Sequence, residues 1–134
     1  MAALGKILLF SATQSRTARL NALLGKLNVN FELDVQALEH IGEVDYNNYS
    51  LVLLDAIQPN SNSLEFCNLI KLYCQSKIPV VMLGQDESLK TIVEAYKNGA
   101  DYYIPWKETG EEAQLNVIKQ IIQRAASQFG RVSA

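Results

Sequence analysis

Short runs of purely apolar residues alternate with segments of helical periodicity along most of this chain. The runs at residues 7–10, 51–54 and 80–83 contain no polar side chain. A strand that is buried on both faces has this composition, because neither face meets water. Strands separated by helical segments predict a parallel sheet with helices on both of its faces.

Two further strands have the pattern of sheet edges. Residues 31–35 alternate between apolar and acidic side chains, so one face of this strand should meet water. The strand at residues 102–104 runs into Pro105, which lacks the N–H that a neighbouring strand requires. With these two strands at the edges, right-handed crossovers predict a doubly wound, five-stranded parallel sheet of order 2-1-3-4-5, the flavodoxin-like α/β architecture.

Apolar residues at helical spacing predict the helices that cover this sheet, and we expect their stripes to form the core. We expect five helices. They are a helix with Leu20, Leu23, Leu24 and Leu27, a short weak helix at residues 37–41, a helix at residues 63–74, a helix with Leu89, Ile92, Val93 and Tyr96, and a last helix with Ile118, Ile121, Ile122 and Ala125. Gly99 is placed to end the fourth of these helices, and Thr109 with Glu112 forms a capping box for the last. We expect one domain at residues 1–128, followed at residues 129–134 by a disordered tail or the start of a linker.

Composition narrows the classes of partner. A net charge of -2 gives no basic surface for direct nucleic-acid binding, and no apolar stretch has the length of a membrane span. The start of the chain lacks the pattern of a secretory signal, so we expect a cytoplasmic protein.

Cys67 and Cys74 lie two helical turns apart, too far to form a disulfide, and should be reduced thiols. His40 is the only histidine and is expected at the surface, which disfavours metal sites and histidine-based catalysis.

The predicted topology brings several strand ends together. In sheets of this order, ligands bind beyond the carboxyl ends of the strands, where the winding reverses between the first and third strands. This places Ser11, Ala12, Asp55, Gly84 and residues 105–107 around one shallow crevice. We take it as the candidate functional site.

Asp55 at the end of the third strand, Pro59 four residues later and the helix that follows resemble the receiver domain of two-component response regulators. The resemblance extends over residues 6–128 and includes Gly99 and Tyr103 before and within the fifth strand. It implies a signalling module in which Asp55 is the phospho-acceptor candidate. Receivers transfer a phosphoryl group from a partner histidine to this aspartate through magnesium, as in a phosphorelay.

Four positions depart from what the resemblance implies. Two acidic residues should follow the first strand to help hold magnesium, but Ser11 and Ala12 stand there, and Thr13 and Gln14 do not restore a carboxylate. The hydroxyl residue that should end the fourth strand is Gly84. The lysine of the fifth-strand loop is replaced by Trp106, or by Ile104 if Pro105 is matched to the family's proline, and Lys107 does not stand in either position.

These departures favour a degenerate pseudo-receiver that is not an enzyme, has no metal site or cofactor, and acts through protein contacts. Magnesium enters only if the Asp55 site is functional. Tyr103, the aromatic residue that rotates on activation in the family, and Trp106 are the switch or interface candidates. The implied partners are a histidine kinase or an output protein or domain, with a homodimer through the face between the helix at 89–96 and the last helix as a further option.

Several alternatives stay open. Asp55 could serve only as a hydrogen-bond acceptor at a strand end, or could be phosphorylated by a histidine kinase in an atypical receiver. Asp86 and Glu87 could assist a metal, although acids also suit the start of a helix. A flavin-binding domain on the same sheet is the third reading, because the hydroxyls of Ser11, Thr13, Ser15 and Thr17 follow the first strand; flavin absorbance in the purified protein would reveal it.

Overall fold

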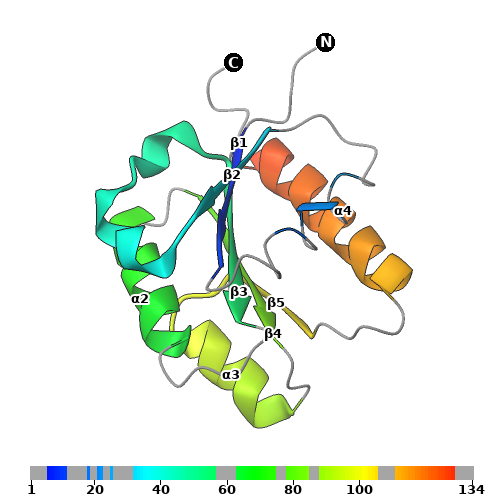
Figure 1. The fold of residues 1–134 in the computed structure, drawn as a ribbon. Coiled ribbons are helices and arrows are strands. Elements are labelled where there is room, and N and C mark those ends of the chain that lie inside the picture. The colour runs from blue at the N-terminus through cyan, green and yellow to red at the C-terminus, as the bar shows by residue number, and fades with distance from the viewer. Residues whose placement is uncertain are drawn as a thin grey trace.

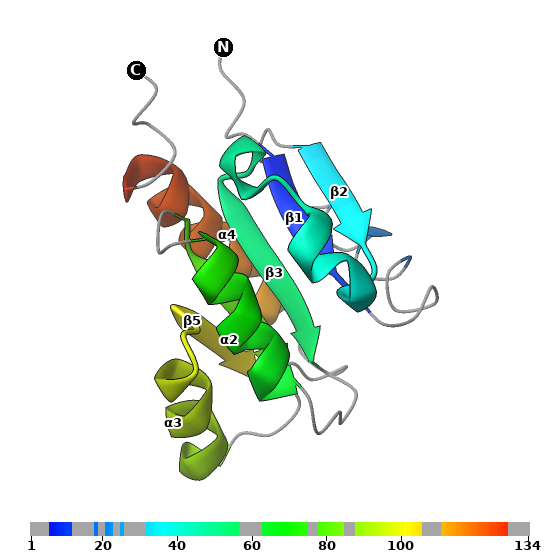
Figure 2. The ribbon, with the colours of Figure 1, turned by 90° about the vertical axis from the view of Figure 1, so that its left-hand side faces the viewer.

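A computed structural model describes residues 6–11, 18, 21–22, 25, 32–56, 63–74, 78–84, 88–105 and 111–128. Its centre is a parallel sheet of five strands, β1 (Lys6–Phe10), β2 (Glu32–Gln36), β3 (Leu51–Ala56), β4 (Val80–Gly84) and β5 (Tyr102–Pro105). The strand order is β2-β1-β3-β4-β5, which confirms the predicted topology. Figure 2 shows β2 at one edge of the sheet.

Strand burial follows strand position. Every residue of β4 is buried, and Leu8, Leu9 and Phe10 of β1 are 0% exposed. β2 has no buried residue, and Val35 is 38% exposed. The apolar runs therefore mark the interior strands and the alternating run marks an edge, because a strand with both faces buried meets no water while an edge strand does.

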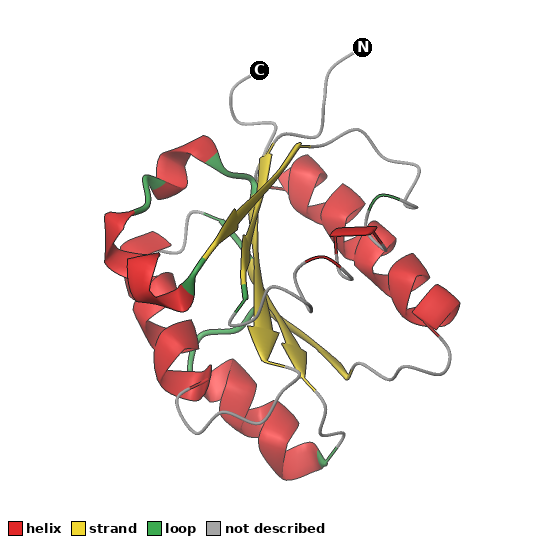
Figure 3. Cartoon of the chain, in the orientation of Figure 1, coloured by secondary structure: helices red, strands yellow, loops and turns green. Residues whose placement is uncertain are grey.

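Helices cover both faces of the sheet (Figures 1 and 3). α4 (Glu111–Gln128) lies on one face, and α2 (Ser63–Cys74) and α3 (Leu89–Lys97) lie on the other. Successive strand residues point to opposite faces, so the core divides in two. Ile7 and Leu9 pack with Ile118 of α4, whereas Leu8 and Phe10 pack in the cluster of α2. Ile121 also belongs to the α4 core; the side chains of Ile122 and Ala125 lie outside the description.

The segment between β2 and β3 is not an α-helix. The short helix expected at residues 37–41 is replaced by two 3-10 turns, η1 (Leu38–Glu43) and η2 (Tyr46–Asn48). Tyr46 anchors them, because its buried hydroxyl donates to the Ile41 carbonyl at 2.6 Å. Val44 between the turns is extended, which prevents them from joining into one helix.

The apolar stripe of α3 corrects a prediction. We expected Leu89, Val93 and Tyr96 to be core, but they are 75%, 40% and 46% exposed. Ala95 is the residue that α3 buries. Among the described elements, α3 contacts the edge strand β5 and the helix α2, and Ala95 is on the side that meets them. Gly99 does end the helix, with the predicted left-handed φ of 102°.

An ion pair ties α2 to the sheet. Asp101, just before β5, accepts from the Lys71 ammonium at 2.5 Å and from the Val80 backbone N–H at 2.8 Å. The two side chains are only 19% and 32% exposed. The pair therefore holds together α2, the start of β4 and the start of β5.

Both cysteines are free and buried, as expected. Burial raises the pKa of the Cys67 thiol from its ordinary value of 9.0 to about 11 and that of Cys74 to about 12. Because both thiols are harder to ionise in the folded state, their contribution to stability is complete below pH 9 and is lost as the pH rises toward 11 and 12.

We therefore expect the free energy of unfolding to fall by roughly 2 kcal/mol between pH 7.5 and pH 10. Urea unfolding at the two pH values measures this. In a Cys67→Ala/Cys74→Ala variant the fall should be much smaller, whatever its stability at pH 7.5. If the free energy of unfolding falls equally in the variant, groups other than the two thiols cause the loss of stability at high pH.

Among the described residues, no helix has the length and apolar composition needed to cross a membrane.

Candidate functional site

Asp55 and Ser11 lie side by side at the carboxyl ends of two neighbouring strands. The parallel register of β1 and β3 pairs Phe10 with Leu54, so the next residue of each strand meets at the same edge. The Ser11 hydroxyl donates to Asp55 Oδ2 at 3.0 Å. Both residues are buried, at 6% and 8% exposure. The structure thus brings together the two crevice residues that the topology predicted, with Asp55 inside β3 rather than after it.

This pair does not fit a magnesium site of the receiver kind. A small hard cation requires several oxygen ligands, mainly carboxylates. Ser11 offers a neutral hydroxyl in place of an acid, and that hydroxyl is bonded to Asp55. No cluster of three or more metal-binding side chains occurs in the part of the chain that the structure describes. Ala12, Thr13, Gln14, Asp86 and Glu87 lie outside the described residues.

Tyr103 fills the space beside Gly84, the position at which the resemblance implies a hydroxyl residue. A Cβ added to Gly84 would lie 2.5 Å from Tyr103 Cζ and 2.6 Å from Cε2, and closer still to the phenol oxygen. These separations are far below van der Waals contact. Any side chain at position 84 and the inward Tyr103 ring therefore exclude one another.

Two contacts hold Tyr103 in this place. Its half-buried ring packs against the core cluster on the α2 side of the sheet. Its backbone N–H donates to the Tyr96 hydroxyl of α3 at 3.2 Å. The neighbouring Tyr102 packs instead on the α4 side, so the two adjacent tyrosine rings lie on opposite faces of the sheet.

The fifth strand gives no lysine within the described residues. Ile104, one of the two candidates for that position, is 4% exposed and belongs to the core under α4. Pro105 pairs with Gly84 at the end of the sheet, as its edge position allows. Trp106, Lys107 and Thr109 lie outside the described residues, as do Pro59, Ser15 and Thr17.

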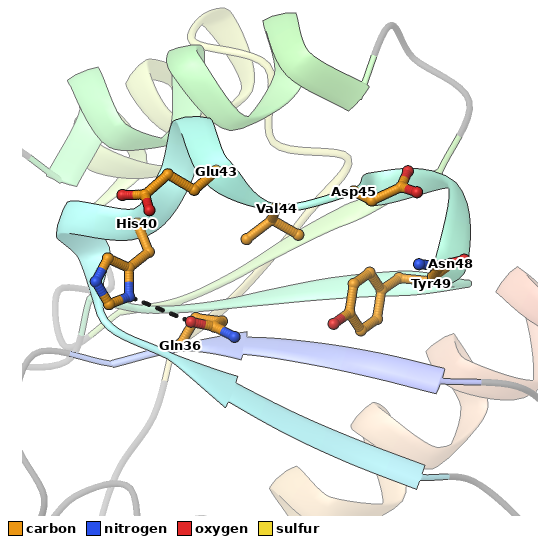
Figure 4. A pocket seen from close by; sticks show the side chains of 7 residues that line it. All are labelled: Gln36, His40, Glu43, Val44, Asp45, Asn48 and Tyr49. Carbon is orange, nitrogen blue, oxygen red and sulfur yellow. Dashed lines mark hydrogen bonds between the residues drawn. The ribbon is translucent and has the colours of Figure 1, made fainter.

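A second hollow lies between the end of β2 and the turns η1 and η2 (Figure 4). It has a volume of about 330 Å³ and is lined by Gln36, His40, Glu43, Val44, Asp45, Asn48 and Tyr49. His40 is half-buried, and its Nδ1 lies 3.3 Å from Gln36 Oε1. The sequence did not reveal this pocket, because it depends on the two turns that replace a helix.

Solved structures of other proteins share this fold. No protein-family model and no curated protein matches the sequence. A Burkholderia thailandensis protein assigned to pilus assembly (cpaE) is similar, at 20% identity and a TM-score of 0.74 over 92% of this chain and 98% of that one. A pilus assembly-related protein of Burkholderia pseudomallei has 16% identity and a TM-score of 0.72 over 93% and 91%.

The response regulator domain of Thermotoga maritima CheB is similar to the same extent. It has 18% identity and a TM-score of 0.70 over 91% of this chain and 96% of that domain. The match runs through nearly the whole of both chains. The chain therefore has the fold of the receiver domains of response regulators.

Proposed function

We propose that this chain is a receiver-like signalling module that acts through protein contacts, without magnesium-dependent phosphorylation and without enzymatic activity of its own. The fold does not decide this, since one fold hosts many functions. The observation that carries the proposal is the crevice itself, where Tyr103 occupies the space beside Gly84 and Ser11 is bonded to Asp55.

The charge of a phosphoryl group would be unfavourable at Asp55. A phosphoryl group on Asp55 would bring about two negative charges to a buried position. Such charge is normally offset by a cation and by donors aimed at the phosphoryl oxygens. Among the described residues the neighbours of Asp55 include a serine, and Gly84 has no side chain. With a hydroxyl in place of a carboxylate at Ser11 and no side chain at Gly84, we propose that Asp55 stays unmodified.

The exposed stripe on α3 supports the contact role. Leu89, Val93 and Tyr96 are spaced to fall on one side of the helix and remain in water. Apolar and aromatic side chains in such a position are typical anchors of protein interfaces. Tyr103 adjoins this helix through its bond to Tyr96, so the candidate switch residue lies beside the contact surface. The partner we propose is a kinase, an output domain or a second copy.

If this stripe serves a partner and not the fold, its loss should leave the isolated domain stable. We expect Leu89→Gln and Val93→Gln each to change the free energy of unfolding by less than about 0.5 kcal/mol. Ala95→Gln, on the buried side of the same helix, should cost about 1 to 3 kcal/mol by overpacking. Urea unfolding compares the three; equal losses would show that the stripe belongs to the core.

The second candidate is an atypical receiver that is phosphorylated on Asp55. It is favoured by the position of Asp55 at the carboxyl end of β3, beside the crevice. Incubation with a small phosphodonor such as acetyl phosphate, followed by mass spectrometry of the intact protein, separates the two candidates. Our proposal predicts no added phosphoryl mass. A mass gain that disappears in Asp55→Asn would establish the atypical receiver instead.

A further inference from the structure

The pocket beneath η1 and η2 lies in the most acidic part of the chain. Five of the fourteen acidic residues fall between positions 32 and 48, and none of the twelve lysines and arginines does. They are Glu32, Asp34, Glu39, Glu43 and Asp45. Of these, Glu43 and Asp45 line the pocket, whereas Glu32 lies 3.9 Å from the Lys6 ammonium. Carboxylates around a hollow raise the local concentration of cations. The charge distribution points to a cationic ligand.

The lining matches the two parts of a long basic side chain. Figure 4 shows Val44 pointing down from the arch that carries Glu43 and Asp45, with the Tyr49 ring below it and the Asp45 carboxylate directed away from Val44. An apolar stem can pack on the valine and the tyrosine ring, and a guanidinium can also stack on that ring. The exposed carboxylates of Glu43 and Asp45 at the rim then attract the charged head.

The carboxylates of Glu43 and Asp45 have oxygens available to a ligand, and the Tyr49 ring is held in one orientation. Glu43 has neither a hydrogen-bond nor an ion-pair partner within the described ranges, and Asp45 uses one oxygen, Oδ1, to accept from the Asn47 N–H at 3.1 Å. The Tyr49 hydroxyl donates to Asp34 at 2.8 Å, which orients the ring. Burial, together with this bond, raises the pKa of Tyr49 to about 12, so the ring is neutral at physiological pH.

We propose that this pocket docks an arginine-bearing basic segment of a partner protein. The pocket lining contains no residue of the α3 stripe and neither Ser11 nor Asp55, although the Gln36 carbonyl accepts from the Ser11 N–H at 3.3 Å. The inference therefore does not depend on the state of Asp55. Arginine fits better than lysine, because its flat head has five donors for the many acceptors here and stacks on an aromatic ring. The module would then carry two contact surfaces.

Titration of the ¹⁵N-labelled chain with the peptide acetyl-Gly-Arg-Gly-Arg-Gly-amide, followed by amide NMR, tests this proposal. We expect saturable shifts in residues 43–49 that weaken at high salt. The same peptide with citrulline in place of arginine, which keeps the shape and loses the charge, should produce none.

The variant for this test is Glu43→Gln with Asp45→Asn, which keeps the shape of the pocket and leaves asparagine, an equally good cap, at the start of η2. We expect about tenfold weaker binding, and unchanged binding in the control Glu94→Gln on α3. No saturable shift, equal shifts with the citrulline peptide, or unweakened binding to the double variant would overturn the proposal. So would concentration-dependent shifts at these amides without peptide, which would assign the pocket to a second copy.

Discussion

Replacing Gly84 with alanine is expected to destabilise the domain by about 1 to 3 kcal/mol, although alanine is ordinarily the better residue in a strand. The added methyl group would lie within 2.6 Å of two ring carbons of Tyr103, so the ring must leave its place on the α2-side core. Urea unfolding measures the loss. Nuclear Overhauser contacts between the ring and its core neighbours should disappear in the variant.

The matched control removes the ring. In a Tyr103→Ala background, Gly84→Ala should cost nothing or stabilise the domain slightly, because the three atoms nearest to the new methyl group all belong to the removed ring. The difference between the two backgrounds is the coupling energy of the pair. If alanine at position 84 costs the same in both backgrounds, Tyr103 does not fill the crevice and the account of this site is wrong.

Asp101→Ala should destabilise the domain by about 2 to 3 kcal/mol. It leaves the largely buried Lys71 ammonium without its partner and removes the acceptor of the Val80 N–H. Uncompensated charge and unpaired donors in such positions are costly. Thermal or urea unfolding measures the effect.

Lys71→Met is the control for this pair. It keeps the apolar stem and leaves Asp101 bonded to the Val80 N–H, with 32% of its side chain in contact with water. We expect a loss of about 1 kcal/mol, smaller than that of Asp101→Ala. The reverse order would mean that the lysine and not the aspartate organises this junction.

The sequence predicted the sheet well because burial acts on every strand residue. Residues 51–54 and 80–83 had to be interior, and residues 31–35 had to be an edge, so the order 2-1-3-4-5 followed. The juxtaposition of Ser11 and Asp55 then followed from the topology alone. Gly99 was predictable for a similar reason, since its φ of 102° suits glycine.

Other features depend on tertiary contacts that no local pattern contains. Helical spacing made Leu89 and Val93 look like core, but spacing does not say how much of a helix its neighbours cover. The place of Tyr103 against Gly84 required the pairing of β4 with β5. The pocket required Tyr46 to hold two short turns in place of a helix. Lys71 and Asp101 lie thirty residues apart, beyond the range of sequence periodicity.

The most direct test of the account is a magnesium titration of the ¹⁵N-labelled chain, with beryllofluoride added afterwards and amide shifts followed at Ser11, Asp55 and Gly84. Ser11→Asp, which restores one carboxylate beside Asp55, is the comparison and should bind magnesium more tightly than the natural chain. We expect no saturable shift at these three amides in the natural chain. Saturable shifts centred on Asp55, enlarged by beryllofluoride, would contradict it and show a working receiver site.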